Sequence, residues 1–142
     1  MSIYNNILVA IDLNEEAEKV AQKAYQISLK TGAKLTFIHV TEPLSYAYGG
    51  DIPMDLSAIQ KQLQEHAEKR MTEFVQQHGF NDAEQLLASG HIETEVHRVA
   101  NELSTDLIVV GSHGRHGLAL LLGSTSNGIL HGATCDVLAV RI

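Results

Sequence analysis

Short apolar runs alternate with segments of helical periodicity along the whole chain. Residues 7–11 form a continuous apolar run rich in β-branched side chains, the pattern of a strand that is buried on both faces. Further apolar runs predict four more strands, at residues 35–40, 84–88, 107–110 and 137–140. The run at 84–88 is the weakest of the five. The stretch from Thr41 to Asp55 carries both prolines and a Gly-Gly pair, which predicts a long loop.

Four helices are expected between these strands, because apolar residues recur there at intervals of three and four positions. The first follows Asn14, a suitable N-cap, and ends at Gly32. The fourth is short and covers residues 124–131. The second ends near Gly79, and the inward faces of the second and third are formed by apolar residues, namely Leu56, Ile59, Leu63, Ala67, Met71, Phe74 and Val75, and Ile92, Val96, Val99, Ala100 and Leu103.

This alternation predicts an α/β fold: a single domain over residues 1–142 with an open, doubly wound parallel sheet of five strands and helices on both faces. Crossover connections are right-handed, so covering both faces requires the chain to reverse its direction across the sheet. Strand order 3-2-1-4-5 places that reversal between the first and fourth strands. We favour this order because Asp12 and Gly111 then face one crevice at the carboxyl ends of the strands, where such sheets bind ligands.

Glycine is concentrated after the fourth strand. Of 11 glycines in 142 residues, six lie within 22 positions, namely Gly111, Gly114, Gly117, Gly123, Gly128 and Gly132. Glycines and the exposed N–H groups of a helix start suit a phosphate cradle, and Arg115 is the sole formally charged residue between Asp106 and Asp136. Neither a P-loop lysine nor a GxGxxG fingerprint is present. A glycine-rich turn can also serve packing alone.

Composition narrows the class of protein. Ten basic against 17 acidic residues give a net charge of −7, which opposes a broad nucleic-acid surface. No apolar run approaches the ~20 residues that span a bilayer, and the N-terminus has no signal-peptide pattern. Cys135, the lone cysteine, favours a reducing, cytoplasmic setting and a structural role, because the adjacent Asp136 discourages a thiolate. His113 and His116 lack an evident third metal ligand, so we expect no metal site.

The chain resembles the universal stress protein family over essentially its whole length. The resemblance is carried by residues 7–12, 38–40 and 106–114, and by Gly123-Ser124-Thr125 followed by residues 135–140. It implies a nucleotide-binding-like α/β fold, a cytoplasmic role in stress survival and a homodimer joined through the last strand, Val137–Ile142. That strand is expected at the sheet edge, where an apolar strand invites pairing with a copy of itself.

The resemblance also implies binding of ATP or AMP, with Mg²⁺ as a candidate companion ion. Asp12 would meet the ribose or adenine side, and Ile11 and Val40 would contact the base. Five further residues would hold the ribose and phosphates, namely Gly111, Gly114, Gly123, Ser124 and Thr125. His113 and Arg115 complete the expected nucleotide-binding residues, and for Arg115 two roles stay open, a phosphate contact or a solvated side chain. A carboxylate accepts hydrogen bonds from hydroxyls, and backbone N–H and serine hydroxyl groups donate to phosphate oxygens.

One spacing departs from the family pattern. Nucleotide-binding members carry G-x2-G-x9-G-(S/T), whereas eight residues separate Gly114 from Gly123 here. Members without the pattern bind no ATP, so two alternatives stay open: a nucleotide-independent dimeric regulatory or chaperone-like protein, and a slow ATP hydrolase. The hydrolase is the weaker alternative, because no residue with a clear water-activating role is evident.

Overall fold

A computed structural model describes residues 3–13, 16–42, 57–80, 82–112 and 124–141. Five parallel strands form one sheet in the order β3-β2-β1-β4-β5. The strands are β1 (Asn6–Ala10), β2 (Lys34–Thr41), β3 (Glu84–Ser89), β4 (Leu107–Gly111) and β5 (Asp136–Val140). The predicted α/β class and strand order are therefore confirmed.

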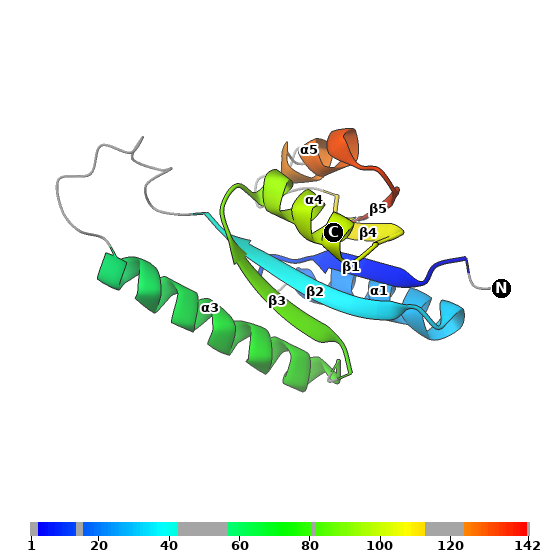
Figure 1. Ribbon diagram of the computed structural model, residues 1–142. Coiled ribbons are helices and arrows are strands. Elements are labelled where there is room, and N and C mark those ends of the chain that lie inside the picture. The colour runs from blue at the N-terminus through cyan, green and yellow to red at the C-terminus, as the bar shows by residue number, and fades with distance from the viewer. Residues whose placement is uncertain (1–2, 14–15, 43–56, 81, 113–123, 142) are drawn as a thin grey trace.

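Among the described residues, four helices cover the sheet, two on each face (Figure 1). They are α1 (Ala17–Thr31), α3 (Ser57–His78), α4 (Ile92–Glu102) and α5 (Ser124–Gly132). Each strand alternates its side chains between the two faces. Val9 and Phe37 therefore pack under α1 and α3, whereas Leu8 and Ile38 pack under α4 and α5, and all four are fully buried.

The two cores differ in the size of their side chains. The core under α1 and α3 is aromatic, with Phe37 and Phe80 rings whose centroids lie 5.4 Å apart and Phe74 and Tyr25 beside them. The core under α4 and α5 contains only aliphatic buried residues, such as Ile108 and Ile129. Within the described residues, the larger volume of the rings thus fills only one face of the sheet.

The start of the first helix and part of the inward face of the second differ from the prediction. Helix α1 begins at Ala17 with Glu16 in the N-cap position, and the predicted cap Asn14 lies outside the described residues. Its predicted end is confirmed: Gly32 has φ of 75°, a left-handed conformation that glycine adopts without strain, and its N–H bonds the carbonyl of Ser28.

In α3, Ile59 and Leu63 were expected to face inward but are 45% and 41% exposed. The physical reason is length. The 22 residues of α3 span about 33 Å, whereas the six residues of β3 span about 20 Å. The amino-terminal part of α3 consequently extends past the sheet (Figure 1), and the burial expected from periodicity is found only nearer the other end, at Ala67, Met71 and Val75.

Candidate functional site

The carboxyl ends of β1 and β4 lie side by side. The two strands are parallel and in register from Ile7 opposite Leu107 to Val9 opposite Val109. Their following segments therefore leave the sheet at the same edge, and the direction of winding reverses between these two strands. The strand arrangement thus puts the segments that begin with Asp12 and Gly111 at neighbouring strand ends, as predicted, and Asp12 is exposed.

Ile11 and Val40 contribute to this edge in different ways. The Ile11 side chain is 5% exposed and belongs to the core under α1 and α3. Val40 is half-buried and packs against the core on the opposite face, under α4 and α5. The two side chains therefore point to opposite sides of the sheet, so a ligand at this edge reaches Ile11 through its backbone.

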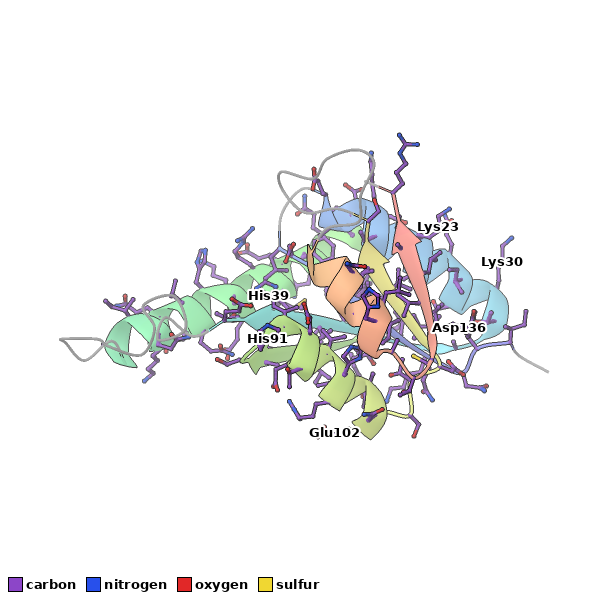
Figure 2. All side chains as sticks on the ribbon, turned by 90° about the horizontal axis from the view of Figure 1, so that it is seen from above. Lys23, Lys30, His39, His91, Glu102 and Asp136 are labelled. Carbon is purple, nitrogen blue, oxygen red and sulfur yellow. The ribbon has the colours of Figure 1, made fainter. Side chains whose placement is uncertain are left out.

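His39 is a site residue that the sequence reasoning missed. Its Nδ1 donates a hydrogen bond of 2.9 Å to the carbonyl oxygen of Ile11, and the N–H of Ile11 bonds the carbonyl of Ile38 at 3.0 Å. These two bonds tie the end of β1 to β2 immediately before Asp12. His91, the N-cap residue of α4, follows β3, the neighbour of β2, at the same end of the sheet; His39 and His91 are labelled in Figure 2. Two sequence signals pointed to His39: it is a polar residue inside an apolar strand, and it lies within residues 38–40, which carry part of the family resemblance.

The end of β4 is held to β5. Gly111 lies opposite Val140, and the N–H of Ser112 bonds the Val140 carbonyl at 2.7 Å. The next candidate residues, His113, Gly114, Arg115 and Gly123, lie outside the described residues, as does His116. Ser124 and Thr125 are the first two residues of α5, and only their backbone is described. Because the first N–H groups of a helix lack intrahelical acceptors, this helix start presents donors suited to an anion.

Two of the six clustered glycines serve helix packing instead of a phosphate cradle. Gly128 and Gly132 lie inside and at the end of α5, facing α4. A Cβ at Gly128 would overlap the Glu93 carboxylate, and one at Gly132 would lie 2.7 Å from Nε2 of His97. A helix-interior glycine costs about 0.5–1 kcal/mol relative to alanine, and here its smallness permits the close approach of α4. The packing interpretation of glycine therefore holds for these two.

The contact between Glu93 and Gly128 changes the charge expected around the glycine-rich segment. Although residues 107–135 contain only one formally charged residue, folding places the Glu93 carboxylate against α5. The glycine-rich segment is therefore charge-poor along the sequence but has an acidic neighbour in space, at Gly128. A local sequence window could not reveal this, because Glu93 belongs to a different helix.

Cys135 lies just before β5, at the end of the strands opposite to Asp12, and the carboxylates of Asp106 and Asp136 act on it. The pKa of the Cys135 thiol is raised by burial first, and then by the negative charges of Asp136 and Asp106. The Tyr4 hydroxyl donates a 2.8 Å hydrogen bond to Asp136, which raises the pKa of Tyr4. A raised thiol pKa leaves little thiolate at neutral pH, which supports the structural role expected for Cys135.

A cavity of about 550 Å³ lies between α1 and α3, and Leu13, the residue after Asp12, is part of its lining. It is lined by residues of both signs, namely Leu13, Glu18, Arg70, Glu73, Phe74, Gln77 and His78. Within the described part of the chain, no group of three His, Cys, Asp or Glu residues is placed to hold a metal ion. No helix among those residues has the length and apolar character needed to cross a bilayer.

Some known proteins are similar to this chain in sequence, and others have a similar fold. Universal stress protein A homolog 2 of Coxiella burnetii is 43% identical over 146 residues, covering 100% of this chain and 98% of that protein. The structure of UspA from Lactobacillus plantarum superposes with a TM-score of 0.79 at 23% identity, covering 99% of this chain and all of that one. A universal stress protein in complex with cAMP superposes with a TM-score of 0.65 at 24% identity, and the match covers 98% of both chains. A model of the universal stress protein family matches residues 3–141, and the chain belongs to that family.

Proposed function

We propose that this universal stress protein binds an adenine nucleotide at the carboxyl edge of its sheet, between β1 and β4. The observation that carries the proposal is the exposed Asp12 at the end of β1, directly beside the end of β4 and at the edge where α5 begins. A carboxylate for ribose hydroxyls and a helix start for phosphates form a donor and acceptor set that fits a nucleotide. The cAMP bound by a protein of the same fold supports an adenine ligand.

Each residue has a separate task in this proposal. Asp12 accepts hydrogen bonds from the ribose hydroxyls, while the backbone of Ile11 and the side of Val40 border the base. Beyond Gly111, the ribose and phosphates are held by the candidate residues of the glycine segment and the start of α5, namely His113, Gly114, Arg115, Gly123, Ser124 and Thr125. ATP or AMP is the proposed ligand, and Mg²⁺ would shield the additional phosphate charge of ATP.

Equilibrium titration of the purified protein with ATP, AMP and adenosine, each with and without Mg²⁺, tests the proposal. We expect saturable binding of at least one adenine nucleotide, and adenine absorbance in acid extracts of freshly purified protein. Absence of binding by all three ligands would contradict the proposal and favour a nucleotide-independent regulatory or chaperone-like protein, to which the short spacing between Gly114 and Gly123 points. Phosphate release during the same titration would identify the slow hydrolase.

The proposal includes a cytoplasmic homodimer formed through β5 and acting in the stress response. β5 is the last strand of the sheet, so one of its sides has no neighbouring strand within the described chain. The Val140 carbonyl bonds Ser112, so Val140 faces β4. Successive residues of a strand direct their backbone groups to alternate sides, so Ala139 directs its N–H to the open side.

A proline at position 139 tests the β5 dimer. Ala139→Pro removes an N–H on the open side and spares the bonds to β4, because proline is tolerated where a strand N–H faces outward. We expect a monomer by light scattering, with Ala139→Ser, which keeps the N–H, remaining a dimer. A dimer that persists in Ala139→Pro would place the contact on another surface.

A further inference from the structure

Helix α5 contacts α4 at two glycines, Gly128 and Gly132. Each glycine leaves a notch on the surface of α5, because it has no side chain. Glu93 occupies the notch at Gly128, and His97 occupies the notch at Gly132. Glu93 and His97 are four residues apart on α4, and Gly128 and Gly132 are four residues apart on α5. Side chains at this spacing lie on one face of a helix, so the two contacts succeed each other along a single line of close approach.

These notches are tightly filled. A Cβ at Gly132 would lie 2.7 Å from Nε2 and 3.1 Å from Cδ2 of His97, and one at Gly128 would overlap both the carboxyl carbon and the oxygens of Glu93. The Nε2 atom of His97 is buried and has no hydrogen-bond partner among the described residues. The imidazole therefore acts at this contact through its shape rather than through a hydrogen bond.

The helix that these contacts hold is short. α5 contains nine residues, and among those whose side chains are described, Ile129 is the one that is fully buried. One buried side chain anchors a helix to the sheet but leaves its sliding and rotation weakly restrained. The two notches supply that restraint, because a displaced α5 would bring its own backbone against Glu93 or His97.

We propose that Glu93 and His97 are positioning residues that fix α5 against α4 and thereby aim the first N–H groups of α5 at the phosphates of the bound nucleotide. This inference rests on the proposed function, because it assigns the start of α5 to phosphate binding. Neither side chain touches the ligand. The expected signature is therefore a loss of affinity that depends on phosphate, since adenosine makes no use of the start of α5.

The test is a double-mutant cycle between the two helices. Gly128→Ala introduces the Cβ that overlaps Glu93 and should weaken AMP and ATP binding about tenfold, the equivalent of one lost hydrogen bond to a charged group, while adenosine affinity stays within about twofold. The single variant Glu93→Ala empties the notch at Gly128 and should itself weaken AMP and ATP binding. The double variant Glu93→Ala/Gly128→Ala fills the emptied notch with the alanine Cβ and should recover AMP binding relative to both single variants. Asn127→Ala is the matched control, because Asn127 is an exposed neighbour on the same helix.

Three results would overturn the inference. Equal loss of AMP and adenosine affinity in Gly128→Ala would indicate a general structural defect, and failure of the double variant to recover would show that Glu93 is not the obstacle. Glu93→Gln keeps the shape of the side chain, so affinity for ATP should remain at the wild-type value. Binding that becomes about tenfold tighter in this variant would show that Glu93 acts through charge instead.

Amide hydrogen exchange separates this inference from the proposed function. If the wild-type protein binds no nucleotide, the proposed function fails, and the positioning by Glu93 and His97 is still read from exchange rates along α5. Gly128→Ala should then accelerate exchange in α5, with reversal in the double variant, and Gly132→Ala should do the same through His97. Unchanged exchange in both single variants would overturn the positioning role.

Discussion

The two ends of the sheet are built differently. At the amino end, the Asp106 carboxylate accepts two backbone hydrogen bonds, from the N–H of Asn5 at 2.8 Å and from that of Asn6 at 3.0 Å. The Asp106 N–H in turn bonds the Asn6 carbonyl, and Tyr4 bonds Asp136. These contacts join the starts of β1, β4 and β5. The carboxylates of Asp106 and Asp136 at the amino end therefore have hydrogen-bond partners within the protein.

At the carboxyl end, the side chains hold the backbone but leave Asp12 exposed. His39 bonds the Ile11 carbonyl, and the N–H of Gly90 bonds the Thr41 carbonyl at 3.1 Å. Figure 2 shows His39 and Asp136 toward opposite ends of the sheet. The comparison indicates that an aspartate at one end stabilises the fold, whereas an aspartate at the other remains available to a ligand.

The largest expected effect is the loss of stability when Asp106 is replaced. Asp106→Ala removes both hydrogen bonds to the β1 backbone and should lower the free energy of unfolding by about 2 kcal/mol, measured by urea denaturation. Asp106→Asn should lose less, because its amide oxygen still accepts one bond. Asp82→Ala, at an exposed position, is the matched control. Reduced nucleotide affinity in folded Asp106→Ala protein would show that the amino end of the sheet also contributes to binding, which contradicts the separate roles of the two ends.

The corresponding experiment at the carboxyl end of the sheet replaces Asp12. Asp12→Ala should weaken adenine-nucleotide binding about tenfold, because the ribose hydroxyls lose a charged acceptor. Its free energy of unfolding should change by less than about 0.5 kcal/mol, since the side chain is exposed. Calorimetric titration and urea denaturation measure the two quantities. An unchanged affinity would remove Asp12 from the proposed site.

Replacement of His39 should affect both stability and nucleotide affinity, because His39 holds the backbone of Ile11 beside the proposed site. His39→Leu removes the bond to the Ile11 carbonyl and should lower the free energy of unfolding by about 1 kcal/mol. His39→Asn places an amide N–H near the position of Nδ1, so we expect recovery of both stability and nucleotide affinity. If Asn behaved like Leu, packing of the imidazole rather than its hydrogen bond would be the relevant contribution.

The smallest effect concerns the reactivity of Cys135. Because burial and the two nearby aspartates raise the pKa of the thiol, iodoacetamide should modify the folded protein more slowly than the urea-unfolded chain at neutral pH. The rate should continue to rise with pH beyond the point where the rate for an ordinary thiol levels off, because the pKa of the Cys135 thiol is raised. Asp136→Asn removes the second cause but not burial, so it should accelerate alkylation only modestly. Equal rates for folded and unfolded protein would show that Cys135 is not protected.

Much of the candidate site followed from patterns that are local in the sequence. The apolar runs ending at Ile11 and Val110 placed two strands, and right-handed crossovers required a reversal of direction somewhere in the sheet. The favoured strand order put that reversal between these two strands, and the structure confirms the order. Asp12 needed no further information, because it directly follows a strand. His39 was missed for the opposite reason: nothing in the residues around it indicates that its partner is the carbonyl of Ile11.

The sequence by itself determined the five strands and the position of Asp12 directly after the first, because both follow from the period of apolar residues. The strand order was favoured because it brings Asp12 and Gly111 together, and the structure confirms it. Only the tertiary structure decided the role of Gly128 and Gly132, and the arrival of Glu93 beside a segment with few charges of its own. Those features depend on which side chains face each other across two helices. A glycine looks the same in a sequence whether it frees the backbone for a ligand or makes room for a neighbouring helix.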